Sequence, residues 1–368
     1  MNAKHNYKYF STWIPLLFIA SFLLYYSHKI PILICNMIYI NIAIFGGIKY
    51  FCVPKIKIKH YLIGLFCLLT IVSGISSGIH TQNINFSLYL KTISYVIIAI
   101  LALEYPPPHI VIKSFFYGVS AWFILILLNS KIDPNDYFLR LSRNYFSVLL
   151  LALLCLYYFA TAKKACSKIP FTPALIYMAV SFLAVGRNGI FSSLILVSGI
   201  LYINYWLYSP NSKQKFINAY FLGVAFIIFL FIVGQTNIVN IGFSRFKAMG
   251  IKSQGRSLIW KQYFGLAYGS LTNLLLGNPL EGIEIFEHYE YNLHNSFLQM
   301  HTTYGLPFSL IVVGGLAHSL YSCYKKKEYL IILLMATFLF RATTDQLGFA
   351  FFTEFLFYYF VFYSFFSE

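Results

Sequence analysis

The sequence predicts an all-α, polytopic integral membrane protein with about twelve transmembrane helices and one large polar loop between the ninth and the tenth. Two properties of the chain predict this class. Of its 368 residues, 59% are hydrophobic and 10% are charged, whereas a soluble domain carries roughly 25% charged residues. The apolar residues also gather in stretches that are long enough, or nearly so, to cross a bilayer. We therefore expect a single integral membrane domain over residues 1–368.

The predicted spans follow one another through short loops over most of the chain. No small-residue cleavage site follows the first apolar stretch, which favours a retained helix over a removed signal peptide. The run Pro106–Pro108 predicts a stiff turn between the fourth and fifth spans. Only the Gly186–Gly189 turn separates the seventh span from the eighth. The spans cover residues 11–28, 30–48, 60–79, 86–104, 109–129, 143–162, 170–186, 188–208, 216–234, 302–323, 328–341 and 346–366.

Basic residues in the loops predict the orientation, because cytoplasmic loops carry an excess of lysine and arginine. With both termini in the cytoplasm, the inside loops carry lysines and all six arginines fall outside. The planar fork of arginine binds phosphate and carboxylate bidentately, so this segregation indicates recognition of an anionic ligand. The basic residues form no continuous groove, which argues against a nucleic-acid partner. The arginines are Arg140, Arg143, Arg187, Arg245, Arg256 and Arg341.

The polar loop, residues 235–301, is the one stretch large enough to fold outside the bilayer. We expect any chemistry to take place there and on the helix ends that face it. Arg245 lies early in this loop with Lys247 and Lys252. Cations in such a cluster attract anionic lipid or an anionic substrate in a general way.

Arg187 and Asn188 lie between two apolar helices and are flanked by Gly186 and Gly189. A snorkelling anchor is one interpretation of a boundary arginine. The glycines, however, let a ligand approach the backbone closely, and the next helix begins here with unpaired amides and a positive dipole end. We favour an anion-binding site, with Asn188 as a further substrate-binding residue.

Arg256 begins a segment that predicts an amphipathic helix. Leu258, Ile259, Trp260, Tyr263 and Phe264 form an apolar face suited to the membrane interface. An interfacial helix with an exposed basic side and a phosphate clamp at Arg256 are compatible interpretations.

His294 and Asn295 lie where the loop returns to the membrane. Histidine is the side chain most easily tuned to act as a base near neutral pH. The alternative is a hydrogen-bonded histidine at a helix start, with Asn295 or Ser296 as the N-cap. We place His294 among the catalytic candidates and Asn295 among the substrate-binding ones.

The remaining charged residues leave two interpretations open. Arg341 and Asp345 are four residues apart in the sequence, which suits either an ion pair or a substrate contact. Arg143 lies in a short outer loop of mixed charge, and the same two interpretations apply to it. Four glutamates recur every three residues, which favours a solvated acidic face over a metal site, because no HExxH-type pair is present. The six cysteines show no ligand spacing, so we expect no metal and no cofactor. The glutamates are Glu281, Glu284, Glu287 and Glu290.

With these residues in place, the chain resembles the O-antigen ligase and O-antigen polymerase superfamily of bacterial envelopes. The likeness covers the span architecture over the whole length and, in sequence, four elements. Ala184–Gly189 resembles the family's Arg/Gly element, and Ser253–Trp260 its Gly-Arg-x-x-x-Trp element. Leu276–Gly282 resembles its Gly-rich stretch, and His294–Gln299 followed by Gly305 its His-Asn element. Each motif is loose alone, and their order makes the resemblance fairly specific.

The resemblance implies a metal-independent glycosyltransferase of the inner membrane, with both termini cytoplasmic and the active site periplasmic. The donor would be an oligosaccharide on undecaprenyl diphosphate. Arg187 and Arg256 match the family's diphosphate-binding arginines, and His294 matches the histidine proposed to activate the acceptor hydroxyl. Membrane lipid and a chain-length regulator are further implied partners.

The acceptor separates two activities. A polymerase passes the chain to another lipid-linked repeat unit, and a ligase passes it to lipid A–core. Ligases usually carry a small residue or tyrosine where this chain has Phe308, and the outer loop is compact for docking lipid A–core. These departures favour a polymerase, with a ligase as the alternative.

Two other classes stay open. A transporter is disfavoured because no repeat symmetry is evident and few charges lie within the spans, the nearest being Lys91, Lys113 and Glu354. A structural scaffold would not need arginine confined to one side of the membrane.

Overall fold

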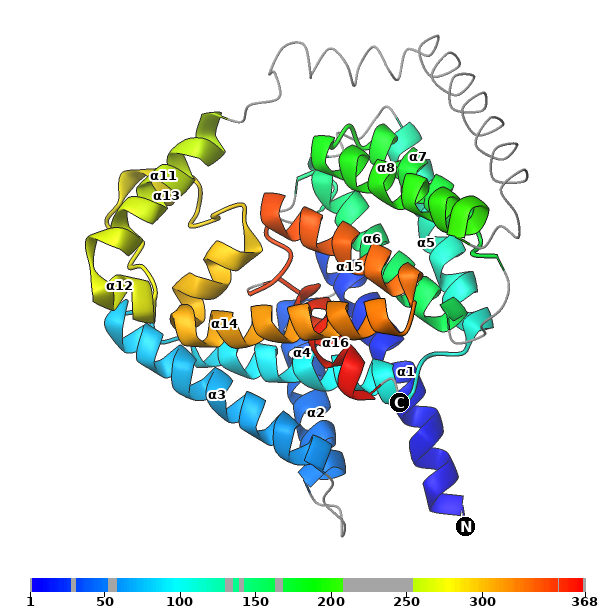
Figure 1. Ribbon diagram of the computed structural model, residues 1–368, viewed down its shortest axis with the longest axis horizontal. Coiled ribbons are helices and arrows are strands. Elements are labelled where there is room, and N and C mark those ends of the chain that lie inside the picture. Colours follow the sequence, from blue (N-terminus) through cyan, green and yellow to red (C-terminus); the bar gives the residue numbers. More distant parts are fainter. Residues whose placement is uncertain are drawn as a thin grey trace. The chain divides into compact units, whose positions relative to one another are not determined.

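A computed structural model describes residues 2–27, 31–51, 58–129, 135–138, 142–162, 168–207, 254–349 and 351–366 (Figure 1). Within these ranges the regular elements are helices and no β-strand forms, which confirms the all-α prediction. Each predicted span in these ranges overlaps a helix, because a continuous apolar stretch is a local signal, but the helix in the predicted span 346–366 begins only at Glu354. The predicted ninth span, residues 216–234, and Arg245 lie outside the described residues.

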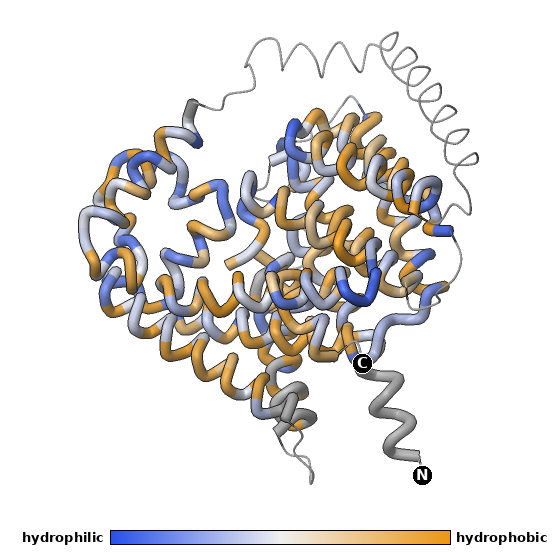
Figure 2. Tube along the Cα trace, in the orientation of Figure 1, coloured by the Kyte–Doolittle hydropathy of each residue, from blue (hydrophilic) through white to orange (hydrophobic). Residues whose placement is uncertain are grey.

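Six of the described helices are long and apolar enough to cross a membrane. The other apolar helices are shorter, so the number of spans and the sidedness of the loop stay predictions. Orange dominates α3 and α15 in Figure 2, whereas α11 to α13 mix blue, white and orange. The six candidates are Tyr61–His80, Phe86–Glu104, His109–Leu128, Asn144–Ala162, Arg187–Leu207 and Ser296–Lys325.

The chain divides into two compact units, described here one at a time. Unit 1 comprises residues 1–107, 254–326 and 342–368. In it α4 packs against α1, α2, α3 and α16, and α14 packs against α3 and α16. The side chains of α4 from Ser94 to Leu103 are buried, as expected for a helix that is apolar all round. Its helices are α1 (Asn2–Tyr26), α2 (Ile32–Phe51), α3 (Ile58–His80), α4 (Phe86–Glu104), α11 (Gln254–Gly269), α12 (Leu271–Leu276), α13 (Glu284–His288), α14 (Ser296–Lys325) and α16 (Glu354–Phe366).

A buried carboxylate joins three helices of unit 1. Glu354 is fully buried, and its Oε1 accepts hydrogen bonds from Thr92 Oγ1 and Tyr358 OH, each at 2.8 Å. Its Oε2 accepts from the backbone N–H of Phe349 at 2.8 Å, and Thr92 Oγ1 lies 2.6 Å from Tyr304 OH. Buried polar groups are stable where they are hydrogen-bonded, so these contacts support a structural role for Glu354.

The glycine and proline of Tyr304–Pro307 predict a bend inside the tenth span, and the helix α14 bends there. Gly305 has φ 76° and ψ 177°, outside the helical region, and Pro307 follows it. A Cβ at Gly305 would overlap Leu275 O, so the glycine lets α12 approach α14 closely. The helices α11, α12 and α13 thereby gather where α3 ends and α14 begins, and α12 contacts both.

Unit 2 comprises residues 108–253 and 327–341. In it α7 packs against α5, α6 and α8, and Tyr177 OH lies 2.6 Å from Ser192 Oγ between α7 and α8. Asn204 closes a pair of 2.8 Å hydrogen bonds with the backbone of Ile169, which ties the end of α8 to the start of the α7 segment. Its elements are α5 (His109–Leu128), α6 (Asn144–Ala162), α7 (Thr172–Leu183), α8 (Arg187–Tyr202), the π-helix η1 (Ile203–Leu207) and most of α15 (Tyr329–Thr344).

Candidate functional site

The described part of the polar loop has a small apolar core of its own. Ile259 and Tyr263, one turn apart on α11, are buried against Leu280, Phe286 and Leu293. The sequence assigns Ile259 and Tyr263 to a face that meets the membrane, and this assignment is wrong. The same i, i+4 stripe suits a membrane surface and a folded loop, so the pattern alone does not separate the two. Leu258 and Phe264, on another side of α11, are exposed.

This core brings Arg256 close to His294. Trp260 Nε1 donates a hydrogen bond to the carbonyl oxygen of Leu293 at 3.1 Å, which fixes the peptide before His294 against α11. Arg256 lies four residues before Trp260, and therefore on the same side of the helix. The ring of Tyr289 lies edge-on to His294 with centroids 6.1 Å apart, and a Cβ at Gly255 would overlap the Tyr289 hydroxyl.

The backbone of His294 adopts a left-handed conformation, with φ 50°. Its N–H donates to Asn292 Oδ1 at 2.8 Å, which helps to hold this conformation. Non-glycine residues in this region cost free energy and cluster at functional sites. The side chain is half-buried beside two charged groups.

Burial lowers the pKa of His294 below its ordinary value, and the nearby positive charge of Arg256 lowers the pKa further. The negative charge of Asp345 opposes these two effects. A lowered pKa keeps the imidazole neutral at neutral pH, with a lone pair able to accept a proton.

Asp345 completes the cluster from a distant part of the chain. Its Oδ1 accepts from Arg256 Nη2 at 3.2 Å, with side-chain exposures of 10% and 24%. This pairing depends on the start of α14, where Ser296 Oγ donates to Asp345 O at 3.0 Å and accepts from Leu347 N at 2.8 Å. The sequence predicts an ion pair of Asp345 with Arg341 or a substrate contact, and not the pairing with Arg256.

Asn295 is the N-cap of α14, which confirms the expected cap. Its Oδ1 accepts from the N–H groups of Phe297 at 2.9 Å and Leu298 at 3.2 Å, and its Nδ2 donates to Thr343 O at 3.1 Å. The amides at this helix start are therefore used by the cap. The substrate-binding role of Asn295 stays a prediction.

Arg187 and Asn188 belong to unit 2, where they open α8 as expected. Gly186 is the N-cap residue and makes no side-chain cap hydrogen bond, and Val185 before it has φ 53°. A Cβ at Gly186 would lie 2.6 Å from Asn144 Oδ1, so the glycine permits close packing with the start of α6. The predicted anion-binding role of Arg187 is untested by these contacts.

Arg341 lies in the interior of unit 2. It is 0% exposed, and its Nη2 donates to Asn144 O at 3.1 Å and to Ser147 Oγ at 3.2 Å. This burial favours a packing role over the predicted substrate contact. Arg143, also predicted to bind substrate, is half-buried and its Nε donates to Asn135 Oδ1 at 3.1 Å.

The acidic run of the loop is solvated, as predicted. Glu281, Glu284, Glu287 and Glu290 are all exposed. Within the described ranges, no three His, Cys, Asp or Glu side chains gather closely enough to hold a metal ion.

Comparison with protein-family models, with curated proteins and with solved structures finds no match to this chain. The cluster of His294, Arg256 and Asp345 is therefore interpreted from its own chemistry. It combines a proton acceptor with an arginine that a carboxylate holds in place. Such a cluster suits a reaction in which a hydroxyl loses a proton near a group that gains negative charge.

Proposed function

We propose that this protein is a periplasmic-face glycosyltransferase of a bacterial inner membrane that uses an undecaprenyl-diphosphate-linked glycan as donor. We favour an O-antigen polymerase over an O-antigen ligase. The proposal includes twelve spans, cytoplasmic termini and residues 235–301 on the periplasmic side. The observation that carries it is the half-buried His294 beside the Arg256–Asp345 pair, in two of the motifs on which the family resemblance rests.

Each member of the cluster has a role in this reaction. His294 accepts the proton of the acceptor hydroxyl as the new glycosidic C–O bond forms at the anomeric carbon. The bond from that carbon to the diphosphate oxygen breaks, and the electron pair leaves with undecaprenyl diphosphate. Arg256 stabilises this developing negative charge, which is usually a large catalytic term. Asp345 positions the guanidinium and moderates its effect on His294.

The preference for a polymerase rests on the departure of Phe308 from the ligase pattern. Phe308 is fully buried and packs against Tyr304, with ring centroids 4.6 Å apart, and against Phe66 at 5.4 Å. This large side chain occupies the interior of unit 1 where the family's ligases usually carry a small residue or tyrosine.

A lipopolysaccharide gel on a deletion strain of the source bacterium tests the proposal. Loss of the ladder, with a core-plus-one-repeat band remaining, indicates a polymerase. Loss of every band above lipid A–core, with lipid-linked polymer accumulating, indicates a ligase. An unchanged profile would contradict the proposal.

Complementation with variants then tests the site. We expect Arg256→Ala and His294→Ala to abolish the ladder, and Arg256→Lys to reduce it, because lysine keeps the charge and loses the planar fork. Lys261→Ala is the matched control, since Lys261 is an exposed cation on the same helix. Arg187→Ala tests the residue that the resemblance assigns to diphosphate binding. If Arg256→Ala and Arg187→Ala both left glycan length and amount unchanged, the proposal would fail.

A further inference from the structure

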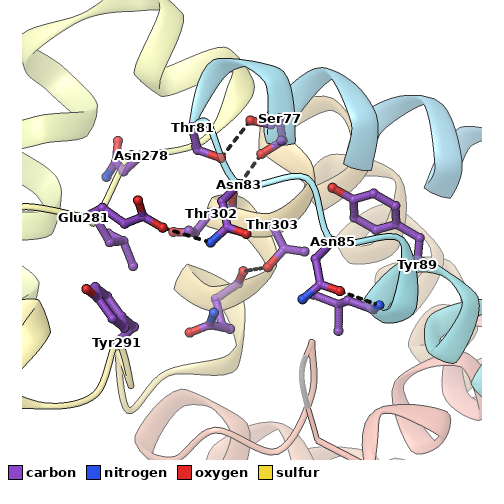
Figure 3. A pocket seen from close by; sticks show the side chains of 14 residues that line it. Ser77, Thr81, Asn83, Asn85, Tyr89, Asn278, Glu281, Tyr291, Thr302 and Thr303 are labelled. Atoms are coloured by element: carbon purple, nitrogen blue, oxygen red, sulfur yellow. Dashed lines mark hydrogen bonds between the residues drawn. The ribbon is translucent and has the colours of Figure 1, made fainter. Parts of the chain in front are cut away.

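A cavity of about 190 Å³ lies in unit 1, where the turn between α3 and α4 meets the segment from α12 to α14 (Figure 3). Two hydrogen bonds join its walls. Ser77 Oγ donates to Thr302 O at 2.8 Å, and Asn83 Nδ2 donates to Glu281 Oε1 at 3.3 Å. An engineered cavity of about 150 Å³ holds one benzene molecule, so a space of this size suits a single six-membered ring.

The described wall of the cavity carries many polar side chains and only one charged group, and more than half of its accessible surface is apolar. It contains hydroxyl and carboxamide side chains, one carboxylate at Glu281, and no lysine, arginine or histidine. A phosphate would meet no cation there, and a lipid chain would have to displace water from many polar groups. The wall therefore suits an uncharged ligand that donates and accepts several hydrogen bonds. The polar side chains are those of Ser77, Thr81, Asn83, Asn85, Tyr89, Asn278, Glu281, Tyr291, Gln299, Thr302 and Thr303.

Two acceptors in this wall have no hydrogen-bond donor within the described residues. They are Asn278 Oδ1 and Gln299 Oε1, and both atoms are buried. The Nδ2 of Asn278 donates to Tyr263 O at 2.9 Å, which fixes the orientation of its amide, and the side chain is 0% exposed. A buried acceptor without a donor costs about 1–3 kcal/mol, and a hydroxyl-bearing ligand would supply the donor.

Aromatic side chains complete the wall. The Tyr89 hydroxyl is already used, because it donates to Gly74 O at 2.6 Å, so its ring faces the cavity as a fixed surface. Tyr291 is 41% exposed and lies at the other side of the cavity from Tyr89. Rings that are apolar on their faces and polar at one edge suit a ligand with both apolar and hydroxylated sides.

We propose that this cavity binds one uncharged sugar residue. That the sugar belongs to the lipid-linked glycan rests on the proposed function, whereas the binding of a neutral sugar rests on the cavity alone. The cavity is a specificity site separate from the charged cluster, and it recognises hydroxyl groups rather than phosphate. Gln299, which is partly exposed, contributes its carboxamide to the sugar.

Saturation-transfer NMR on the full-length protein in nanodiscs tests this proposal. The probes are galactose, rhamnose and N-acetylglucosamine as neutral sugars, with glucuronate and inorganic diphosphate as charged controls. We expect transfer to at least one neutral sugar and none to the controls at this site. Gln299→Met keeps the length of the side chain and removes the acceptor, so we expect binding about tenfold weaker. Gln262→Met, an exposed position on α11, is the matched control and should bind like the parent protein.

Stability gives the second readout. Because Gln299 Oε1 is buried without a donor in the ligand-free protein, Gln299→Met should fold at least as stably as the parent. A glutamine that only supports the fold would instead lose stability when replaced and leave sugar binding unchanged.

The outcomes separate this proposal from the proposed function. No transfer to any neutral sugar, transfer unaffected by Gln299→Met, or stronger transfer to glucuronate would overturn the cavity assignment. If Arg256→Ala abolished the ladder in the cell while no neutral sugar bound, the cavity proposal alone would fail. If neutral sugars bound through Gln299 while Arg256→Ala left the ladder intact, the proposed function alone would fail.

Discussion

Replacing Gly277 by alanine should destabilise the loop at the point where α12 meets α14. Gly277 has φ 102° and ψ 157°, a region that is essentially restricted to glycine and costs other residues about 1–3 kcal/mol. An added Cβ would lie 2.6 Å from His301 O and 2.7 Å from Thr302 O, both backbone atoms that cannot rotate away. Overpacking of this kind costs about 1–3 kcal/mol. We therefore expect Gly277→Ala to lower the free energy of unfolding by about 2–6 kcal/mol.

Gly282→Ala is the control for the backbone contribution. Gly282 also has a positive φ, 76°, but a Cβ there would meet nothing within 4 Å. Its replacement should cost about 1–2 kcal/mol from the backbone alone. Unfolding in detergent with increasing sodium dodecyl sulfate, followed by circular dichroism, measures both variants. If Gly277→Ala were no more destabilising than Gly282→Ala, the close approach of the two backbones would be refuted.

Three further predictions test the site and the core. His294 becomes protonated as the pH falls through its lowered pKa, so activity in proteoliposomes should decline on the acid side below about pH 6.5. Arg256→Gln removes a positive charge that lowers this pKa, so its residual activity should decline at a higher pH. Arg256→Lys keeps the charge and should not shift the decline. Trp260→Phe removes the hydrogen bond to Leu293, and kcat should fall several-fold with an unchanged KM for the lipid-linked donor, whereas a purely structural tryptophan would change only the folded fraction. Glu354→Leu leaves its three donors unsatisfied and should cost about 3 kcal/mol or more in unfolding free energy, with Glu354→Gln costing less. Equal losses for the two Glu354 variants would contradict this last expectation.

The helices and the bend of α14 could be predicted because their causes are local. A long apolar stretch predicts a membrane helix without reference to the rest of the fold, and Gly305 with Pro307 interrupts a helix by its own geometry. The cap at Asn295 is equally local, since its side chain bonds amides two and three residues on. The beginning of α14 at Ser296, earlier than the expected 302, reflects polar residues that continue a helix once capped.

The charged partner of Arg256 could not be found from spacing. Asp345 is 89 residues away, and the two meet because Ser296 bonds the segment that carries the aspartate. Helical spacing pairs Asp345 with Arg341, because spacing identifies neighbours within one helix and not neighbours from distant parts of the chain. The one available signal is that Asp345 directly follows α15, at the same end as the other arginines in the predicted topology. The burial of Ile259 and Tyr263 on α11 could not be predicted for a related reason. The residues that cover them, Phe286 and Leu293, lie in a later part of the loop.

The start of α14 connects the charged cluster to the neutral cavity. Tyr291 and Gln299 line the cavity and lie on either side of His294 in the chain. The cap at Asn295 and the four residues to Gln299 form a rigid turn, with a rise of about 6 Å along the axis. Gln299 lies about one turn beyond this cap, and His294 directly precedes the cap in the chain. If both proposals hold, the cavity would select an acceptor by its hydroxyl groups, and the cluster would act on a hydroxyl of that acceptor. A change at Gln299 should then alter which glycan is elongated, whereas a change at Arg256 should alter how fast any glycan is elongated.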